Sequence, residues 1–353
     1  MSTTILDILN DAADLRRSGK PERALRRARQ AVLLAHCADV SPAVLANSLL
    51  IEGTLVMETR NPIEAVSILR AAKSTLAAAN PDGLLQSTCV TLGRALRRAG
   101  RYDEAEGELR WILDLTSTHL GRGAREVVPI LNELGITYKY AGKFDEARRT
   151  YRRAMAIVKA KVGPDSTYAA DILHNVAGLA HATGDHRRAE AVARRGLAVR
   201  SQVDDQSSLK TAADRAALAA ILISRKEYAE AESILCEVLV SYERVYGSVH
   251  REVAVVLHNL AAVSVAAGDL ETAERNLVRA TEIKRAVLGS RHPELAITLH
   301  NLGTVLHSVG RTAEAEGHLA DCVQILSGVV SPQHPTLSAA RTALDAIRSG
   351  VQN

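Results

Sequence analysis

The sequence predicts an all-α fold, a superhelix of about eight helical hairpins followed by a C-terminal capping helix. Three observations predict it. A block of about 42 residues recurs along almost the whole chain of 353 residues. Each block holds two stretches with apolar residues at helical spacing, and a glycine commonly stands between them. One such hairpin cannot bury its apolar faces alone, so consecutive hairpins are expected to stack into an array with a concave inner surface.

The repeat is marked by small residues at fixed places. An alanine begins the second helical stretch of every block: Ala24, Ala65, Ala105, Ala147, Ala189, Ala231, Ala273 and Ala315. Twelve residues earlier stands Ala12, Gly53, Gly93, Gly135, Ala177, Ala219, Ala261 or Gly303, which lets two helices approach closely. We expect repeats that start near residues 5, 46, 86, 128, 170, 212, 254 and 296, forming one domain over residues 1–353.

The last repeat illustrates how each element is predicted. Residues 296–307 carry apolar side chains at helical spacing, and Gly310 ends this first helix in the left-handed conformation that glycine adopts readily. The second helix begins beside Glu314, because acidic side chains favour a helix N-terminus. Arg60 and Lys226 take the place of the turn glycine in two other repeats. Residues 335–348 then predict a capping helix, since no second helix follows them.

The repeat resembles the tetratricopeptide repeat (TPR), which has a small residue, a glycine and an alanine at positions 8, 15 and 20. The 42-residue period, the connector Leu288-Gly-Ser-Arg-His-Pro-Glu-Leu-Ala296 and the sequence Leu-His-Asn-Leu at 257–260 and 299–302 resemble the kinesin-light-chain-like subfamily, which is also widespread in bacteria. The resemblance implies a right-handed α-α superhelix. It is weaker in the first two repeats and at residues 201–214, where the connector motif is lost.

The resemblance also implies a binding surface on the first helices, at positions 2, 5, 6, 9, 12 and 13 of each repeat. Asparagines at position 6 grip the main chain of an extended peptide in that family, and a carboxamide suits this because it both donates and accepts. Here they are Asn10, Asn175, Asn259 and Asn301. The alternative is that these asparagines tie adjacent helices together. His174, His258 and His300 stand beside three of them.

The side chains at positions 9, 12 and 13 change along the array. Early repeats carry Arg16, Arg17, Arg94, Arg97, Arg98 and Lys139, whereas later repeats carry His181, His307, Thr304 and Ser308. The sequence therefore predicts an inner wall that is strongly cationic in repeats one to four and neutral beyond. Arginine suits bidentate contact with a carboxylate. The alternative is that these arginines only complement the C-terminal ends of helices. Tyr140 is expected to face the same groove.

Neither a catalytic nor a metal site is predicted. The chain has no nucleophile motif, phosphate-binding loop or dinucleotide motif, and its four cysteines are isolated. His174 and His181, like His300 and His307, are seven residues apart, roughly 10 Å along a helix at 1.5 Å per residue, which is too far for one zinc ion. We expect no cofactor and no enzymatic activity, although an active site needs no short motif.

The charge distribution and the composition indicate which classes of partner the chain can bind. Residues 1–200 hold 30 basic and 22 acidic residues (net +8), and residues 201–353 hold 14 and 18 (net −4). The predicted function is a cytoplasmic, non-catalytic scaffold that binds an extended, acidic segment of a protein partner. The alternatives are a peptide-sensing regulator of the bacterial TPR type and an accessory protein or enzyme of a biosynthetic pathway. Aromatic residues make up only 3%, which disfavours nucleic acid. No membrane partner is expected, and a homo-oligomer remains open.

Overall fold

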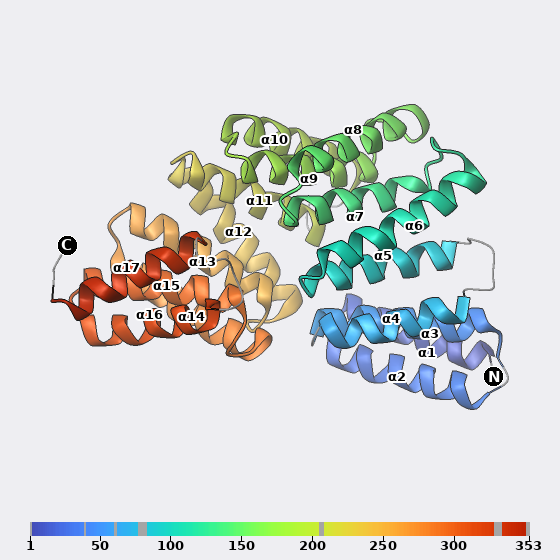
Figure 1. The fold of residues 1–353 in the computed structure, drawn as a ribbon, viewed down its shortest axis with the longest axis horizontal. Helices are drawn as coiled ribbons and strands as arrows, with labels where there is room; N and C mark the ends of the chain where they lie inside the picture. The colour runs from blue at the N-terminus through green and yellow to red at the C-terminus, as the bar shows by residue number, and fades with distance from the viewer. Residues whose placement is uncertain are drawn as a thin grey trace. The chain divides into compact units, whose positions relative to one another are not determined.

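The computed structural model describes residues 2–38, 40–59, 62–76, 83–204, 208–327 and 334–350. These residues form 17 α-helices and no strand, so the predicted all-α fold is confirmed (Figure 1). They fall into two compact units, Met1–Asp214 and Arg215–Asn353, which divide within one helix, α11 (Leu209–Ser224). Each unit is described by itself. None of the described helices is both long and apolar enough to cross a membrane.

The first unit contains five hairpins, in which odd-numbered helices are first helices and even-numbered helices are second helices. Its helices are α1 (Ser2–Arg17), α2 (Pro21–Cys37), α3 (Pro42–Thr59), α4 (Pro62–Leu76), α5 (Gly83–Arg98), α6 (Tyr102–Leu120), α7 (Val127–Tyr140), α8 (Phe144–Lys161), α9 (Thr167–Ala182) and α10 (His186–Val203). Each helix packs on the next one along the chain, and consecutive first helices also touch, as α5 touches α7 and α7 touches α9.

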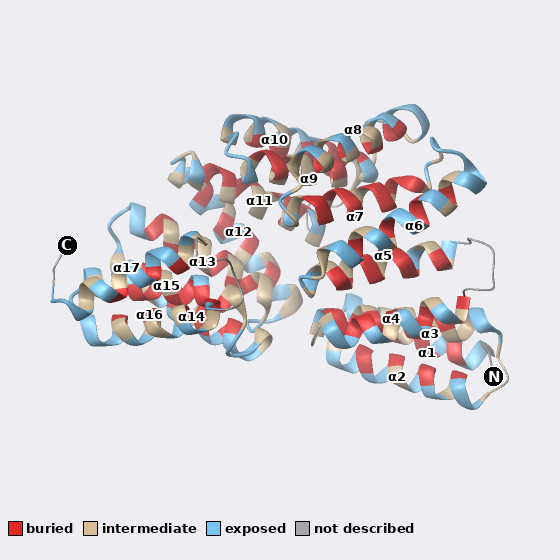
Figure 2. Ribbon diagram, in the orientation of Figure 1, coloured by how far each residue is buried: buried red, intermediate tan, exposed pale blue. Residues whose placement is uncertain are grey.

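The second unit continues the same pattern. Its helices are α12 (Tyr228–Tyr246), α13 (Arg251–Ala266), α14 (Leu270–Leu288), α15 (Pro293–Ser308), α16 (Thr312–Leu326) and α17 (Pro335–Arg348). The last of these covers the preceding hairpin with Leu337, Ala340 and Leu344, which join a core with Leu299 and Leu319. In both units the buried residues run along the helix faces that meet a neighbouring helix (Figure 2).

Glycine at position 8 lets the two helices of a hairpin touch. A Cβ atom added at Gly93 on α5 would lie 2.7 Å from Leu109 Cγ on α6, which is closer than real Cβ contacts allow. Gly53 and Gly303 stand in the same relation to Leu69 and Leu319 of their own second helices. The close approach predicted from the small residues is therefore confirmed at these positions.

The turns between helices use a left-handed residue at position 15. Gly19, Gly100, Gly142, Gly184, Gly268 and Gly310 all have positive φ there. Lys226 takes the same conformation, with φ 64°, and it is the non-glycine residue with positive φ among those described. Arg60, the other predicted substitute, lies outside the described residues. Lys226 thus keeps the turn geometry at a cost that glycine avoids.

Candidate functional site

Side chains of consecutive first helices contact one another at positions for which the sequence predicts contact with a ligand. Arg16 on α1 pairs with Glu58 on α3, and Arg97 on α5 pairs with Glu133 on α7. In the second unit, Asn301 on α15 bonds to His258 on α13. We call the surface formed by positions 2, 5, 6, 9, 12 and 13 of the first helices the first-helix face.

The arginines of repeat three are partly neutralised within the protein. Arg94 Nε and Arg97 Nε donate to the two carboxylate oxygens of Glu133, at 3.2 and 2.9 Å, and the Glu133 side chain is only 3% exposed. Arg98 donates instead to the main-chain oxygen of Met57, at 3.2 Å. The prediction of a strongly cationic wall was therefore too simple, because Glu133 occupies position 6 of the next repeat and offsets part of the charge.

Lys139 is a cation without a carboxylate partner among the described residues. Its Nζ lies 4.9 Å from the ring centre of Tyr140, and the Arg97 guanidinium lies 5.1 Å from the same ring. Burial lowers the pKa of Lys139, and the nearby charge of Arg97 lowers it further. Gly178 on α9 faces this side chain, since a Cβ atom there would lie 3.4 Å from Nζ, in van der Waals contact. Tyr140 itself is 55% exposed.

His181 completes this group at position 12 of repeat five. Burial lowers its pKa, and the charges of His186 and Lys139 act in the same direction. Its ring meets the His186 ring edge to face, with centres 5.3 Å apart. The structure therefore brings together Arg97, Lys139, Tyr140 and His181 from three consecutive first helices. All four are among the predicted residues.

Two asparagines at position 6 are held by the preceding repeat through their amide nitrogen. Asn175 Nδ2 donates to Asn132 Oδ1 at 2.9 Å and to the main-chain oxygen of Asp171 at 3.0 Å. Asn301 Nδ2 lies 3.3 Å from His258 Nε2. Asn132 and His258 both occupy position 5. Neither Oδ1 atom accepts a hydrogen bond from a described residue, and neither is among the buried polar atoms that lack a partner.

For Asn175 and Asn301 the structure shows the contacts of the alternative interpretation, and contact with a peptide stays a prediction. The amide nitrogen ties neighbouring repeats together, while the oxygen stays accessible as an acceptor. Asn259 is half-buried at the same position of α13, and Asn10 is exposed on α1.

The position-5 histidines have different surroundings. His174 Nδ1 lies 2.7 Å from a carboxylate oxygen of Asp214, whereas His258 Nδ1 lies 3.4 Å from the Thr298 hydroxyl. Burial lowers the pKa of His258 to about 4, and the charge of Lys284 adds to the effect. Burial also lowers the pKa of His300.

Residues predicted further along α15 make local contacts. Thr304 is exposed and donates to the main-chain oxygen of His300 at 3.0 Å. His307 is half-buried, and its Nδ1 has no partner among the described residues. These side chains share one helix face with Asn301.

Several residues of this face, and two that lie behind it, were missed from the sequence. Glu133 and Asn132 stand at positions 6 and 5 of repeat four, and the same repeat alignment would have placed them there. Asp214 and Thr298, both at position 3, were also missed. Their pairing with residues of the preceding repeat carries no local signal in the sequence.

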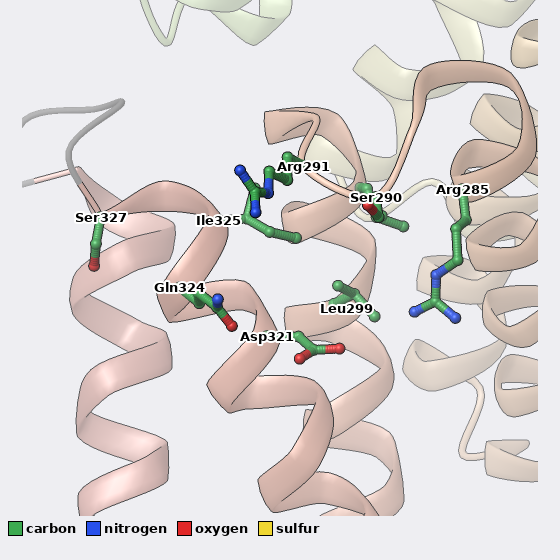
Figure 3. Close-up of a pocket in the computed structure, with 9 residues that line it drawn as sticks. Arg285, Ser290, Arg291, Leu299, Asp321, Gln324, Ile325 and Ser327 are labelled. Carbon is green, nitrogen blue, oxygen red and sulfur yellow. The ribbon is translucent and has the colours of Figure 1, made fainter.

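Three cavities of the described residues lie away from the predicted site residues. The described cavities sit between consecutive second helices, and none is lined by a predicted site residue. The largest, about 750 Å³, lies among α14, α15 and α16, with Arg285 and Asp321 on opposite sides of it (Figure 3). Within the described part of the chain no cluster of three or more His, Cys, Asp or Glu side chains could hold a metal ion.

Comparison with known proteins identifies the repeat. The family model described as tetratricopeptide repeat matches residues 126–202, 211–286 and 252–328, which together make up more than half of the chain. A second tetratricopeptide repeat model matches residues 86–111. None of the curated proteins matches the chain.

Solved structures with a similar fold include three proteins of low identity. Rap protein complexed with competence and sporulation factor is 15% identical, with a TM-score of 0.56 and coverage of 99% of both chains. BtubC from P. vanneervenii is 22% identical, with a TM-score of 0.44, and the match covers 78% of this chain and 92% of that one. A putative kinesin light chain from Podosopora anserina is 20% identical, with a TM-score of 0.47 and coverage of 58% and 98%.

The repeat alignment, the paired helices with close contacts at position 8 and the family models agree with one another. Arrays of such repeats are scaffolds for protein–protein interaction. The chain belongs to the tetratricopeptide repeat family.

Proposed function

We propose that the chain is a non-catalytic scaffold whose first-helix face binds an extended, acidic segment of a partner protein. The observation that carries this proposal is the ammonium group of Lys139, which is partly buried and has no carboxylate partner among the described residues. Burying a charge without a counter-ion is unfavourable. A carboxylate supplied by a ligand would relieve this cost at a place where Tyr140 is exposed for contact.

The arginines support the same proposal. Arg94 and Arg97 share the single carboxylate of Glu133, so this group of three charges keeps a net positive charge before Lys139 is added. Arg94 is 41% exposed and can also reach a ligand. An acidic side chain at this point would therefore meet two cations beside an aromatic ring, in the manner of charge-assisted recognition.

In the first unit the main chain of the ligand would be held by the accessible oxygen of Asn175. In the second unit the oxygen of Asn301 could hold a peptide main chain in the same way. These oxygens can accept N–H groups of an extended peptide regardless of its side chains. Affinity would then come from the main chain, and preference for acidic residues would come from Lys139 and its neighbours.

The experiment is a selection from a library of random 12-residue peptides on the full chain, followed by affinity measurement of the enriched peptides. We expect enrichment of Asp and Glu, and a loss of at least tenfold in affinity for K139M, since a charge-assisted bond contributes about 1.5–3 kcal/mol. The matched control is K143M, because Lys143, in the turn after α7, already pairs with Glu106 on α6. Enrichment without acidic residues, or equal losses in both variants, would contradict the proposal.

The alternative is a peptide-sensing regulator, in which binding changes the arrangement of the repeats. It is favoured by the match over 99% of both chains to Rap protein, which was solved in complex with competence and sporulation factor. This alternative predicts that a selected peptide changes the radius of gyration in solution scattering. An unchanged radius on saturation with the peptide would leave the scaffold function and exclude the sensor.

A further inference from the structure

Two buried cations occupy the same place in repeats five and seven. Arg200 on α10 and Lys284 on α14 are 84 residues apart, which is two repeat lengths, and both are almost fully buried. Each cation contacts the residue at position 3 of the next first helix, and that residue in turn contacts the histidine at position 5 of the preceding one. The two groups are therefore equivalent networks within the array.

The guanidinium of Arg200 is bound by three carboxylates. It donates to Asp214 at 2.9 Å, to Asp171 at 2.6 Å and to Asp204 at 3.3 Å. The Oδ1 atom of Asp214 also lies 2.7 Å from His174 Nδ1. Position 6 of the next repeat is Ala217, so His174 has no asparagine of the next repeat to orient, unlike His258.

The network of Lys284 is built from neutral acceptors instead. Lys284 Nζ donates to the Thr298 hydroxyl at 2.8 Å and to the main-chain oxygen of Glu294 at 3.2 Å. Thr298 lies 3.4 Å from His258 Nδ1, and His258 Nε2 lies 3.3 Å from Asn301 Nδ2. The chain of contacts thus runs from a buried ammonium group to the first-helix face.

One arrangement of hydrogens satisfies every group in this chain. Lys284 can only donate, and Thr298 Oγ1 donates its own hydrogen to the main-chain oxygen of Glu294 at 3.4 Å. The hydroxyl oxygen then has a lone pair left for His258, so Nδ1 carries the hydrogen. A neutral imidazole with hydrogen on Nδ1 has an acceptor at Nε2, which takes one amide hydrogen of Asn301.

We propose that Lys284 is a positioning residue of the binding surface: through Thr298 and His258 it orients the Asn301 carboxamide so that Oδ1 faces a bound peptide and accepts a main-chain N–H. The role toward a peptide rests on the proposed function. The orientation itself is a property of the free protein. Repeat eight thereby presents a fixed acceptor, whereas the equivalent ionic network around Arg200 only fixes His174.

The first readout needs no ligand. In protein labelled with ¹⁵N-histidine, the resonance of His258 is assigned through H258Q, and its shifts report which ring nitrogen carries the hydrogen. We expect hydrogen on Nδ1 in the unmodified protein. K284M and T298V should give a mixture of tautomers, and T298S should restore the Nδ1 form because it keeps the hydroxyl. The control R285M removes an exposed cation from the same helix and should change nothing.

The second readout uses a peptide from the library selection whose binding is weakened by N301A, so that it contacts Asn301 in the second unit. We expect K284M and T298V to weaken its binding about five- to tenfold, the effect of misplacing one hydrogen bond, with R285M and T298S within twofold. Helical circular dichroism and the melting temperature show whether each variant is folded. If K284M does not fold, the tautomer and the affinity of T298V test the proposal.

Two results would overturn the proposal. One is hydrogen on Nε2 of His258 in the unmodified protein, and the other is an unchanged tautomer in both K284M and T298V. If the library yields no peptide for the unmodified protein, the proposed function fails, and the tautomer still decides whether Lys284 orients His258 and Asn301.

Discussion

Arg97 on α5 donates from Nε to Oε1 of Glu133 on α7 at 2.9 Å, and this bond joins repeats three and four across the first-helix face. Arg97 is 13% exposed and Glu133 is 3% exposed, whereas Arg94, the second partner of the same carboxylate, is 41% exposed. The two arginines therefore share a partner but differ in burial.

This difference predicts unequal effects on stability. R97M should lower the free energy of unfolding by about 3 kcal/mol, because it removes the better buried partner of a buried carboxylate. R94M should cost less, about 1 kcal/mol or below, because the Arg94 side chain is 41% exposed and Arg97 still pairs with the carboxylate. Urea unfolding followed by circular dichroism measures both. Equal costs would show that burial does not separate the two bonds.

The close contact of Gly93 with Leu109 predicts a penalty for any added side chain. G93A should destabilise the protein by about 1–3 kcal/mol, because the new Cβ would meet Leu109 Cγ at 2.7 Å and force the helices apart. The control is G107A on α6, where a Cβ atom meets nothing within 4 Å. That change should stabilise the protein by about 0.5–1 kcal/mol through helix propensity. Thermal unfolding of the two variants should move in opposite directions.

Lys226 predicts a stabilising substitution. Its φ of 64° is unfavourable for a residue with a Cβ atom, and glycine takes this conformation in six other turns of the same kind. K226G should therefore raise the free energy of unfolding by up to about 1 kcal/mol, after the extra entropy of glycine in the unfolded chain is subtracted. The reverse change, G184A, should lower it. A lower melting temperature for K226G would contradict this account of the turn.

His258 predicts a pH dependence of stability. Its pKa is lowered to about 4 by burial and by Lys284, so the unfolded chain binds a proton below pH 6.5 that the folded protein takes up only near pH 4. The free energy of unfolding should therefore fall as the pH drops from 6.5 to 4, by about 3 kcal/mol for this group. H258Q should remove that part of the slope, whereas H119Q, at an exposed position, should keep it. Identical slopes in both variants would count against a neutral His258.

The fold was predictable because its signals are local and repeat. Small residues at position 8 and glycines at position 15 each mark a backbone requirement, and the structure satisfies it at Gly93 and at Gly184 in the predicted way. Lys226 shows the limit of the pattern. It replaces the usual glycine, yet the turn keeps its shape, with the hydrogen bonds from Lys226 N to the Ile223 oxygen and from Glu227 N to the Leu222 oxygen that the glycine turns also have.

The binding surface was only partly predictable. The repeat alignment placed Arg97, Lys139, Tyr140 and His181 on one surface, and the structure brings them together. It did not indicate which charges cancel, because Glu133 pairs with residues 36 and 39 positions earlier.

The buried networks of Arg200 and Lys284 could not be predicted for the same reason. Lys284 and Arg200 lie on second helices, away from the positions that predict ligand contact, and they reach the first-helix face only through other side chains. Such indirect contacts depend on how neighbouring helices pack, which a repeat alignment does not contain.

Cross-link mapping of a selected acidic peptide would show directly where on the chain the peptide binds. A photoreactive residue placed beside its acidic position would be activated in the complex, and the cross-linked segments of the chain would be identified by mass spectrometry. We expect cross-linked segments on α5, α7 and α9, close to Lys139. Cross-links confined to the second helices, such as those around the cavity between α14 and α16, would contradict the proposed function.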